Sequence, residues 1–512
     1  MLDESRLRNR ALFSKIRSAD EAALLIHNHD NVGFSGFTPS GYPKMTALAL
    51  AKQIKNGRNV KIHIWTGASV GPEVEEALAE VHGVESRVPY YAASNKAMKE
   101  EINTGEIEYI DLHLSEFAQQ VRAGFFGPVD VAVVEALGIT KEGDLILGTG
   151  VGNTPTFVRM AKRIIVEVNT WIPLELEGVH DIYEPPLPPY RREFPIYHPG
   201  DRIGTTTVRC GIDRIDAIVE SHIPDHVREL GVPDENTKKI ADHLMNFLEL
   251  EQAAGRLPDP LLPIQSGVGK IANAVLEGMT RSRFSHISLY SEILQDAVLD
   301  LIRLGKVDTA SGCAFTPSSR VMDMYRKDPD FFNRHLVLRP LEVSNNPGVI
   351  RRLGVISLNV PVEFDIYGQA NSTHVLGRNM VNGIGGSGDY MRNGYLTIFT
   401  GTSTSGKGGS ISRVVPMCSH VDHTEHDTMV FITEQGVADL RNKGPRARAR
   451  EIITHCAHPD YRDILFTYLR EAEKYGGHMP VDLAKAFDMH LHLQEFGTMK
   501  GTRMTRDTKE TA

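Results

Sequence analysis

The chain has few of the residues that build disulfide frameworks and membrane spans. Its only cysteines are Cys210, Cys313, Cys418 and Cys456, which lie far apart in 512 residues and form no Cys-x-x-Cys pair. This usage is typical of a reducing compartment. No apolar run approaches the roughly 20 residues of a membrane helix. The N-terminal stretch MLDESRLRNRALFSKI is charged throughout and has no apolar signal core. We therefore expect a cytoplasmic protein that does not contact a membrane.

An excess of positive charge is also missing. The chain has 56 Lys and Arg against 65 Asp and Glu, which gives a net charge of −9. Bulk nucleic-acid binding depends on a basic face, so we expect no nucleic-acid partner. With 41% hydrophobic and 24% charged residues, the composition is that of a globular protein with large cores. The length predicts roughly two to four domains.

Several widespread catalytic motifs are absent. The chain has no GxSxG nucleophile elbow, and no cysteine lies in a recognisable nucleophile motif. The stretch TSGKGGSIS offers a basic glycine loop around Lys407, but Lys407 is followed by Gly408, so the phosphate-binding pattern GxxxxGK[ST] is not met. The sequence therefore indicates phosphate contact without nucleotide hydrolysis.

A histidine-rich stretch, SHVDHTEHD, is the one segment that suggests a metal. It has His420, His423 and His426 at three-residue steps, with Asp422 and Asp427 between and after them. The pattern is not HExxH, and no distant ligand set accompanies it. We interpret the stretch as a polar turn after a strand and expect no metal.

Apolar strand-like runs alternate with helical stretches along most of the chain. Runs such as NVKIHIWTG, VDVAVVEALG and RIIVEVN are continuous rather than alternating, which is typical of parallel strands buried on both faces. They are separated by helical stretches such as PKMTALALAKQIKNG. The pattern predicts an α/β fold with mostly parallel sheets.

Two internal echoes suggest a duplication. VDVAVVEALGITKEGDLILG (129–148) resembles LNVPVEFDIYGQANSTHVLG (358–377), and SGFTPSGYPKMTALAL resembles QSGVGKIANAVLEGM. We infer two related open α/β domains with an active site in the cleft between them. The predicted divisions are an N-terminal domain (1–225), a linking helical segment (226–260) with Asp234 as helix N-cap, a C-terminal domain (261–500) and a polar tail (501–512).

Two glycine turns could approach a ligand closely. NGIGGSGDYMRNG contains Gly383, Gly385, Gly386 and Gly388, and backbone N–H groups in such a run can hold an oxyanion or a thioester carbonyl. QSGVGKIANAVLEGM places a glycine turn and Lys270 at the start of a helix, where free N–H groups attract phosphates.

The most conspicuous carboxylate is Glu292. In SHISLYSEILQD, residues Ile287 and Leu289 alternate with polar ones as in a half-buried strand, and Glu292 follows directly before Ile293 and Leu294. A buried carboxylate is unfavourable unless it is paired or neutralised. From the residues alone, Glu292 is either a surface corner or a functional group.

Long ordered motifs resemble the acetyl-CoA hydrolase/transferase family. They include LPIQSGVGKIANAVLEG, LYSEILQD, EVSNNPGVIRRLG and FITEQGVADLRNKGPRARAREIITHCAHPDYR, with GFSGFTPSGYPK, TGASVGP and EGVHDIY in the first half. The match covers nearly the whole chain and is strongest for the class I CoA-transferases that use succinyl-CoA and acetate. The resemblance implies that coenzyme A is a substrate, that no metal takes part and that the protein is a homodimer.

The resemblance also implies roles for individual residues. Glu292 would be the acyl acceptor, Gly386 an oxyanion or CoA contact, and Glu434 a second acid near the nucleophile. Ser69 and Asn345 match positions lining the carboxylate pocket. The CoA contacts would be Gly267, Val268, Gly269, Lys270, Ile271, Asn382, Gly386 and Lys407. Close relatives tend to carry asparagine where this chain has Lys270.

The implied function is transfer of CoA between an acyl-CoA and a free carboxylate by ping-pong chemistry through a glutamyl-CoA thioester. Acetate and succinate are the favoured acids, with propionate, butyrate and 4-hydroxybutyrate as alternatives. Two other functions stay open: an acyl-CoA hydrolase with water as final acceptor, and a non-catalytic CoA- or nucleotide-binding module. Arg228 could attract a second carboxylate, although a surface arginine is the commoner role.

Overall fold

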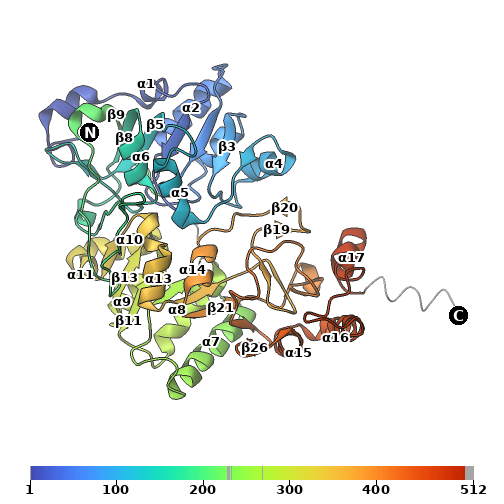
Figure 1. Ribbon diagram of the computed structural model, residues 1–512. Helices are drawn as coiled ribbons and strands as arrows, with labels where there is room; N and C mark the ends of the chain where they lie inside the picture. Colours follow the sequence, from blue (N-terminus) through green and yellow to red (C-terminus); the bar gives the residue numbers. More distant parts are fainter. Residues whose placement is uncertain (1, 228–230, 232, 268, 502–512) are drawn as a thin grey trace.

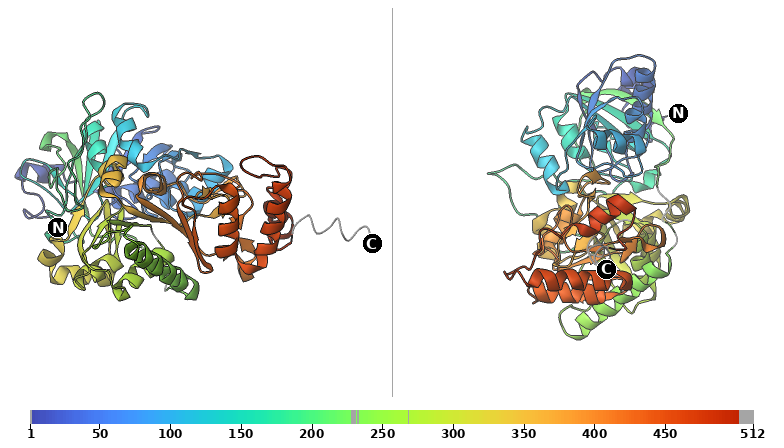
Figure 2. Two further views of the ribbon diagram at one scale, coloured as in Figure 1. Left: turned by 60° about the horizontal axis from the view of Figure 1, so that its bottom comes forward. Right: turned by 90° about the vertical axis from the view of Figure 1, so that its right-hand side faces the viewer.

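A computed structural model of the chain describes residues 2–227, 231, 233–267 and 269–501. Two α/β halves lie one above the other, with the N-terminal half at the top in Figure 1 and in the right-hand view of Figure 2. No helix among the described residues is long and apolar enough to cross a membrane. The predicted Val268 and Arg228 and the tail beyond Gly501 lie outside the described residues.

The N-terminal half is built on one parallel sheet of seven strands. From edge to edge the strands are β4 (Glu108–Tyr109), β3 (Val84–Val88), β2 (Ile62–Trp65), β1 (Asn31–Phe34), β5 (Val131–Ala136), β8 (Arg163–Asn169) and β9 (Ile215–Ser221). All six residues of β5 are buried, as expected for a parallel strand covered on both faces. The helices of this half are α1 (Ala19–Ala23), α2 (Met45–Lys55), α3 (Glu75–Ala79), α4 (Lys96–Thr104), α5 (Leu114–Arg122) and α6 (Thr154–Met160).

The C-terminal half is built on a sheet of eight strands. In spatial order they are β15 (Leu336–Leu338), β13 (Val307–Gly312), β11 (Ile287–Tyr290), β10 (Ile264–Ser266), β16 (Ile356–Asn359), β21 (Leu396–Thr400), β25 (Val430–Thr433) and β26 (Gly436–Asp439). Only the β25–β26 pair is antiparallel. The helices are α7 (Glu235–Ala253), α8 (Lys270–Arg281), α9 (Asp296–Arg303), α10 (Ser319–Lys327), α11 (Pro329–Asn333), α12 (Leu341–Ser344), α13 (Pro347–Leu353), α14 (Ser387–Asn393), α15 (Pro445–His455), α16 (Pro459–Glu473) and α17 (Asp488–Phe496).

The two sheets have the same strand order apart from β26. In each half the first strand along the chain lies in the middle, the second, third and fourth extend to one side, and the fifth to seventh extend to the other. The echo between SGFTPSGYPKMTALAL and QSGVGKIANAVLEGM follows matching strands, since β1 and β10 are the central strands of their sheets. The other echo does not, because the residues of β5 correspond to 360–365, which lie beyond β16 and include β17. The predicted fold class, two related α/β domains with mostly parallel sheets, is confirmed.

Short strands and one long helix complete the C-terminal half. The α7 helix has Asp234 as its N-cap, whose side chain accepts a hydrogen bond from the Thr237 backbone N–H at 2.9 Å, as expected from the sequence. A small sheet joins β18 (Ala370–Asn371), β17 (Glu363–Asp365) and β24 (Val414–Val415), and two further strands, β12 (Ile293–Gln295) and β14 (Ala314–Thr316), pair in parallel. The α15, α16 and α17 helices lie to the lower right in Figure 1.

The halves share an apolar core and are joined by buried ion pairs, among them Arg339–Asp181 and Arg122–Glu342. The largest cluster of buried apolar side chains contains Val134 and Leu176 of the first half together with Leu294 and Leu338 of the second. Beside it, the Arg339 guanidinium binds the Asp181 carboxylate, and both side chains are almost fully buried. The same guanidinium also donates to backbone carbonyls at positions 199 and 201.

Replacing Arg339 by leucine should destabilise the protein strongly. The substitution leaves the buried Asp181 carboxylate without its cation, which typically costs about 3–5 kcal/mol. The exposed pair of Arg8 and Glu177 provides the control, since losing such a surface pair costs about 0–1 kcal/mol. Urea unfolding of Arg339→Leu and Arg8→Leu measures both effects. Equal losses of stability in the two variants would show that the Arg339–Asp181 pair does not hold the halves together.

Candidate active site

A large cavity of about 1390 Å³ lies between the two halves. The N-terminal half contributes side chains from the segments that follow β1, β2 and β3, among them Phe37, Thr38, Ser69 and Tyr90. The C-terminal half contributes the segments after β10, β11 and β16 and the glycine loop before α14. In α/β proteins ligands bind at the carboxyl ends of the strands, and this cavity has that position in both halves.

Glu292 stands at a break in two paired strands. The parallel pair β11–β13 ends at Tyr290 and Gly312, and the pair β12–β14 begins just beyond. At the break, the Glu292 carbonyl accepts hydrogen bonds from the backbone N–H groups of Cys313 at 2.7 Å and Ala314 at 3.0 Å. The backbone is thus fixed while the side chain faces the cavity. The apolar neighbours Ile293 and Leu294 belong to the next strand and are buried.

The Glu292 carboxylate is held by a side-chain amide in a nearly closed environment. Asn345, at the end of α12, donates from Nδ2 to Glu292 Oε1 at 2.7 Å. A small part of the Glu292 side chain reaches the cavity, but protein surrounds the carboxylate. Burial raises the pKa of Glu292 to about 7; the Asn345 hydrogen bond opposes this shift and the nearby negative charge of Asp389 adds to it.

Gly386 lies directly against this carboxylate. A Cβ atom at position 386 would lie 1.9 Å from Oε1 and 2.1 Å from Oε2 of Glu292. The backbone of Gly386 has φ −78° and ψ −10°, angles that any residue adopts. Glycine is therefore required here for close approach and not for a special backbone conformation.

The N-terminal half supports the glycine loop. Both oxygens of Asp111 accept from the Ile384 backbone N–H, at 2.9 and 3.1 Å. The Tyr90 ring packs on Gly385, at 3.3 Å from the position that a Cβ would take there. Burial raises the pKa of Asp111 to about 7, and Asp422 adds to the shift. The position of the loop relative to Glu292 thus depends on contact between the halves.

Several residues predicted from the sequence lie together. Glu292, Asn345 and Gly386 are in direct contact. The same cavity is lined by Ser69, Gly267, Gly269, Lys270 and Asn382. Gly269 precedes the first turn of α8 and has φ +122°, so the predicted helix start is confirmed. The Asn382 side chain donates to the Ser372 carbonyl at 2.8 Å and thereby shapes the loop that leads to Gly383.

Other predicted residues lie further from Glu292. Glu434 accepts from the Ser403 backbone N–H at 2.8 Å and from its hydroxyl, and its charge acts on Arg413, which lines the cavity. Within the described part of the chain, no hydrogen bond joins Glu434 to Glu292. Lys407 is exposed, two residues beyond the cavity-lining Ser405.

The three histidines of the polar turn have separate partners. His420 lies 3.2 Å from Asp422, His423 is 3.1 Å from the Ser387 hydroxyl, and His426 is 3.8 Å from Glu425. Burial lowers the pKa of His423 to about 4. Within the described ranges, no group of three or more His, Cys, Asp or Glu side chains could hold a metal ion.

Two residues beside Glu292 were not singled out from the sequence. Asp389, in the first turn of α14, accepts from Asn345 Nδ2 at 3.0 Å and from the Ser115 hydroxyl at 2.6 Å. Asp389 stands only three residues after Gly386. An acidic residue in the first helical turn after a glycine loop was therefore the sequence feature that could have identified it. Ser115 comes from the N-terminal half, and no local pattern points to it.

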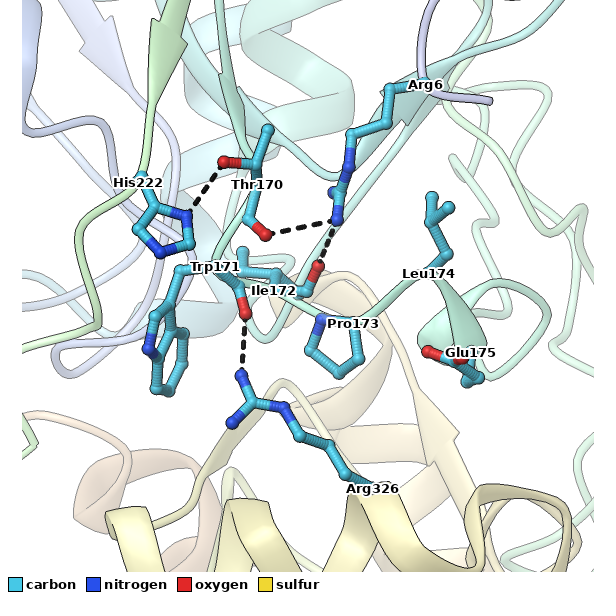
Figure 3. A pocket seen from close by; sticks show the side chains of 9 residues that line it. All are labelled: Arg6, Thr170, Trp171, Ile172, Pro173, Leu174, Glu175, His222 and Arg326. Atoms are coloured by element: carbon cyan, nitrogen blue, oxygen red, sulfur yellow. Dashed lines mark hydrogen bonds between the residues drawn. The ribbon is translucent and has the colours of Figure 1, made fainter. Parts of the chain in front are cut away.

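A smaller cavity of about 520 Å³ also borders Trp171, which lines the large cavity as well (Figure 3). Its cations already have partners: Arg6 donates to the carbonyls of Thr170 at 3.2 Å and Ile172 at 2.8 Å, and Arg326 donates to that of Trp171 at 2.8 Å. These bonds fix the turn after β8 and occupy N–H donors of both guanidinium groups. Glu292 and Gly386 line the larger cavity.

Comparison with known proteins shows the family. The acetyl-CoA hydrolase/transferase N-terminal domain model matches residues 2–220, and the C-terminal domain model matches residues 319–469. The chain belongs to the acetyl-CoA hydrolase/transferase family. It is an enzyme of the CoA-transferase type.

Relatives in this family differ in the reaction that their names give. A succinyl-CoA:acetate CoA-transferase of Clostridium kluyveri is 49% identical over 97% of this chain and 92% of its own length. A propanoyl-CoA:succinate CoA transferase of Escherichia coli is 45% identical, covering 94% and 98%. An acetyl-CoA hydrolase of Candida glabrata is 41% identical, covering 97% of each.

A solved structure supports the fold of this family member. The 4-hydroxybutyrate CoA-transferase of Porphyromonas gingivalis superposes with a TM-score of 0.62 over 90% of this chain and 98% of that one. At 21% identity the likeness concerns the fold alone. It agrees with the class I CoA-transferase architecture expected from the sequence motifs.

Replacing Gly386 by alanine should abolish most activity without unfolding the protein. The added methyl group would occupy the space of the Glu292 carboxylate, while the backbone angles suit alanine. We expect a loss of at least about 10²-fold in kcat/KM, because small displacements of reacting groups have effects of that size. Gly444, at the start of α15 with open space around its Cα, is the control, and Gly444→Ala should keep full activity. A fully active Gly386→Ala variant would show that Glu292 does not react from this position.

Replacing Glu292 by glutamine should stabilise the protein at high pH. The folded-state pKa of about 7 lies above the ordinary 4.5, so the folded protein binds more protons than the unfolded chain between these values. Wild-type stability therefore falls as pH rises through this window, and glutamine removes the effect. We expect the variant to gain about 2–3 kcal/mol over wild type at about pH 8 and nothing at about pH 4. Urea unfolding across this range measures the difference; a difference that does not change with pH would contradict the raised pKa of Glu292.

Proposed function

We propose that the protein moves coenzyme A from an acyl-CoA to a free carboxylate through a covalent glutamyl-CoA thioester on Glu292. Acetate and succinate are the favoured acids. The observation that carries the proposal is the Glu292 carboxylate itself, which is buried at the cavity between the halves, bonded to the Asn345 amide at 2.7 Å and packed on Gly386. Support comes from relatives named for transfer between succinyl-CoA and acetate and between propanoyl-CoA and succinate.

The chemistry explains why a glutamate is needed. The Glu292 carboxylate attacks the acyl-CoA carbonyl carbon, and the carbon–sulfur bond breaks. CoA departs as the thiolate, and a mixed anhydride of Glu292 and the acyl group remains. The thiolate then attacks the Glu292 carbonyl carbon and releases the first acid as its carboxylate, which leaves the glutamyl-CoA thioester. A second carboxylate reverses the two steps. The energy of the thioester is conserved because the side chain is the same functional group as the substrate acid.

Each step builds an oxyanion that needs donors. The Asn345 amide already donates to the oxygen of Glu292 that becomes the oxyanion when thiolate attacks. The Gly386 backbone N–H is proposed as a second donor, and each such donor contributes about 3–4 kcal/mol to transition-state stabilisation. Ser69 is proposed to contact the carboxylate substrate from the N-terminal half, and Glu434 to act near the thioester.

The CoA moiety is proposed to lie along the C-terminal half. Gly267, Gly269 and Lys270 line the cavity at the start of α8, where backbone N–H groups favour phosphates. Val268, Ile271, Asn382 and Lys407 complete the proposed CoA contacts. Binding of these remote groups can be coupled to the reacting centre.

The alternative function is acyl-CoA hydrolysis, because relatives of similar identity are named acetyl-CoA hydrolases. The same thioester would form, with water as the final acceptor. The partly buried position of Glu292 favours transfer, since it limits the access of water to the anhydride and the thioester.

The dependence of the rate on the added carboxylic acid distinguishes CoA transfer from hydrolysis. With acetyl-CoA as donor, loss of acetyl-CoA should accelerate with added succinate in a saturable way and follow ping-pong kinetics. Glu292→Ala should lower the rate by at least about 10³-fold, as expected on removal of a nucleophile. A rate that does not depend on the added acid would favour the hydrolase, and an unchanged rate in Glu292→Ala would contradict the covalent route.

We also propose that the enzyme is a homodimer in the cytoplasm. The family resemblance supports the dimer, and the widely spaced cysteines without a Cys-x-x-Cys pair support a reducing compartment. Light scattering on the purified protein measures the mass, which should be twice 56.8 kDa.

A further inference from the structure

The Asn345 amide lies between two carboxylates. Its Nδ2 donates to Glu292 Oε1 at 2.7 Å and to Asp389 Oδ2 at 3.0 Å. An amide nitrogen carries two hydrogens, so these two bonds use both. Asn345 is fully buried, and its Oδ1 has no hydrogen-bond partner among the described residues. The opposite orientation would direct this carbonyl oxygen at the carboxylate oxygens, which repel it.

Asp389 is itself held by the other half of the molecule. Ser115, near the start of α5, donates from its hydroxyl to Oδ1 at 2.6 Å and from its backbone N–H to Oδ2 at 3.1 Å. Asp389 therefore has three donors around a buried carboxylate, a number that favours the ionised form. Burial raises the pKa of Asp389 to about 6, while the hydrogen bonds from Ser115 and Asn345 and the charge of His113 oppose this shift.

The two carboxylates differ in what happens to them during the reaction. In the resting enzyme the Glu292 carboxylate attracts an N–H group by its own charge. Once Glu292 is a mixed anhydride or a thioester, its carbonyl is neutral and accepts hydrogen bonds more weakly. Asp389 takes no part in bond making, so its charge acts on the amide in every covalent state.

We propose that Asp389 is a positioning residue of the reaction, which keeps one Asn345 N–H directed at the Glu292 carbonyl while that carbonyl is uncharged. Ser115 extends this function to the N-terminal half, because its two hydrogen bonds fix the Asp389 carboxylate. The chain Ser115–Asp389–Asn345–Glu292 thus connects the contact between the halves with the reacting atom. The inference rests on the proposed glutamyl route.

A double-mutant cycle tests the proposal. We expect Asp389→Asn to lower kcat for CoA exchange between acetyl-CoA and succinate by about 10²-fold, with KM for acetyl-CoA changed less than about twofold. If Asp389 acts through the amide, the double variant Asp389→Asn/Asn345→Ala should be no slower than Asn345→Ala alone. Ser115→Ala, which keeps the backbone N–H, should have a smaller loss than Asp389→Asn.

A matched control separates positioning from stability. Asp365 is also a buried carboxylate of the C-terminal half, and it accepts from the backbone N–H groups of Tyr367, Gly368 and Gln369, outside the cavity. Asp365→Asn should lower the melting temperature and change kcat less than about twofold. The inference would be overturned if Asp389→Asn kept full activity. It would also be overturned if the fold-losses in kcat of the two single variants multiplied in the double variant. If the wild-type enzyme showed no exchange of CoA between acids, the proposed function itself would be wrong.

Discussion

The structure is organised around one partly buried carboxylate at the cavity between the halves. Charged carboxylates are unfavourable in such a position, and the pKa of Glu292 is accordingly raised to about 7. The surroundings are built to maintain this state: a strand break places the side chain, a glycine without a Cβ packs on it, and an amide donates to it. None of these features is needed for the stability of an α/β sheet. Together they suit a group that must become, for part of each cycle, an uncharged carbonyl.

The duplicated architecture explains where this carboxylate lies. Both sheets share one strand order, so the segments after β2 and β11 are equivalent positions, and they carry Ser69 and Glu292. The two halves face each other across the cavity and are joined by a common apolar core and by the buried Arg339–Asp181 pair. Asp111 then holds the glycine loop from the opposite half. The reacting geometry is therefore a property of the contact between halves, and neither sheet alone contains it.

The features that could be predicted from the sequence are those that depend on local residue patterns. Continuous apolar runs predicted the buried parallel strands, and Asp234 predicted the start of α7. Glu292 stood out because a carboxylate interrupts an apolar stretch, although the residues alone did not separate a functional group from a surface corner. The family motifs supplied the roles of Asn345 and Gly386, which the structure places in contact with Glu292.

The features that the sequence did not predict depend on tertiary contact. Ser115 and Asp111 stand in an ordinary stretch of the first half, and only the packed halves bring them to Asp389 and Ile384. Cys313 is another case, since its Sγ accepts from the Gly152 backbone N–H at 3.2 Å beside the strand break. Gly152 thus packs against Cys313, whose backbone N–H donates to the Glu292 carbonyl. Distances of more than a hundred residues along the chain separate these partners, so no spacing rule could pair them.

The most direct test of the central claim is the mass of the peptide that contains Glu292. The enzyme is incubated with acetyl-CoA, treated with borohydride, digested and analysed by mass spectrometry. The account predicts a peptide that is lighter by the difference between a carboxyl and a hydroxymethyl group, because borohydride reduces a thioester but leaves a free carboxylate intact. An unchanged Glu292 peptide from an enzyme that is exchanging CoA at full rate would contradict the covalent account.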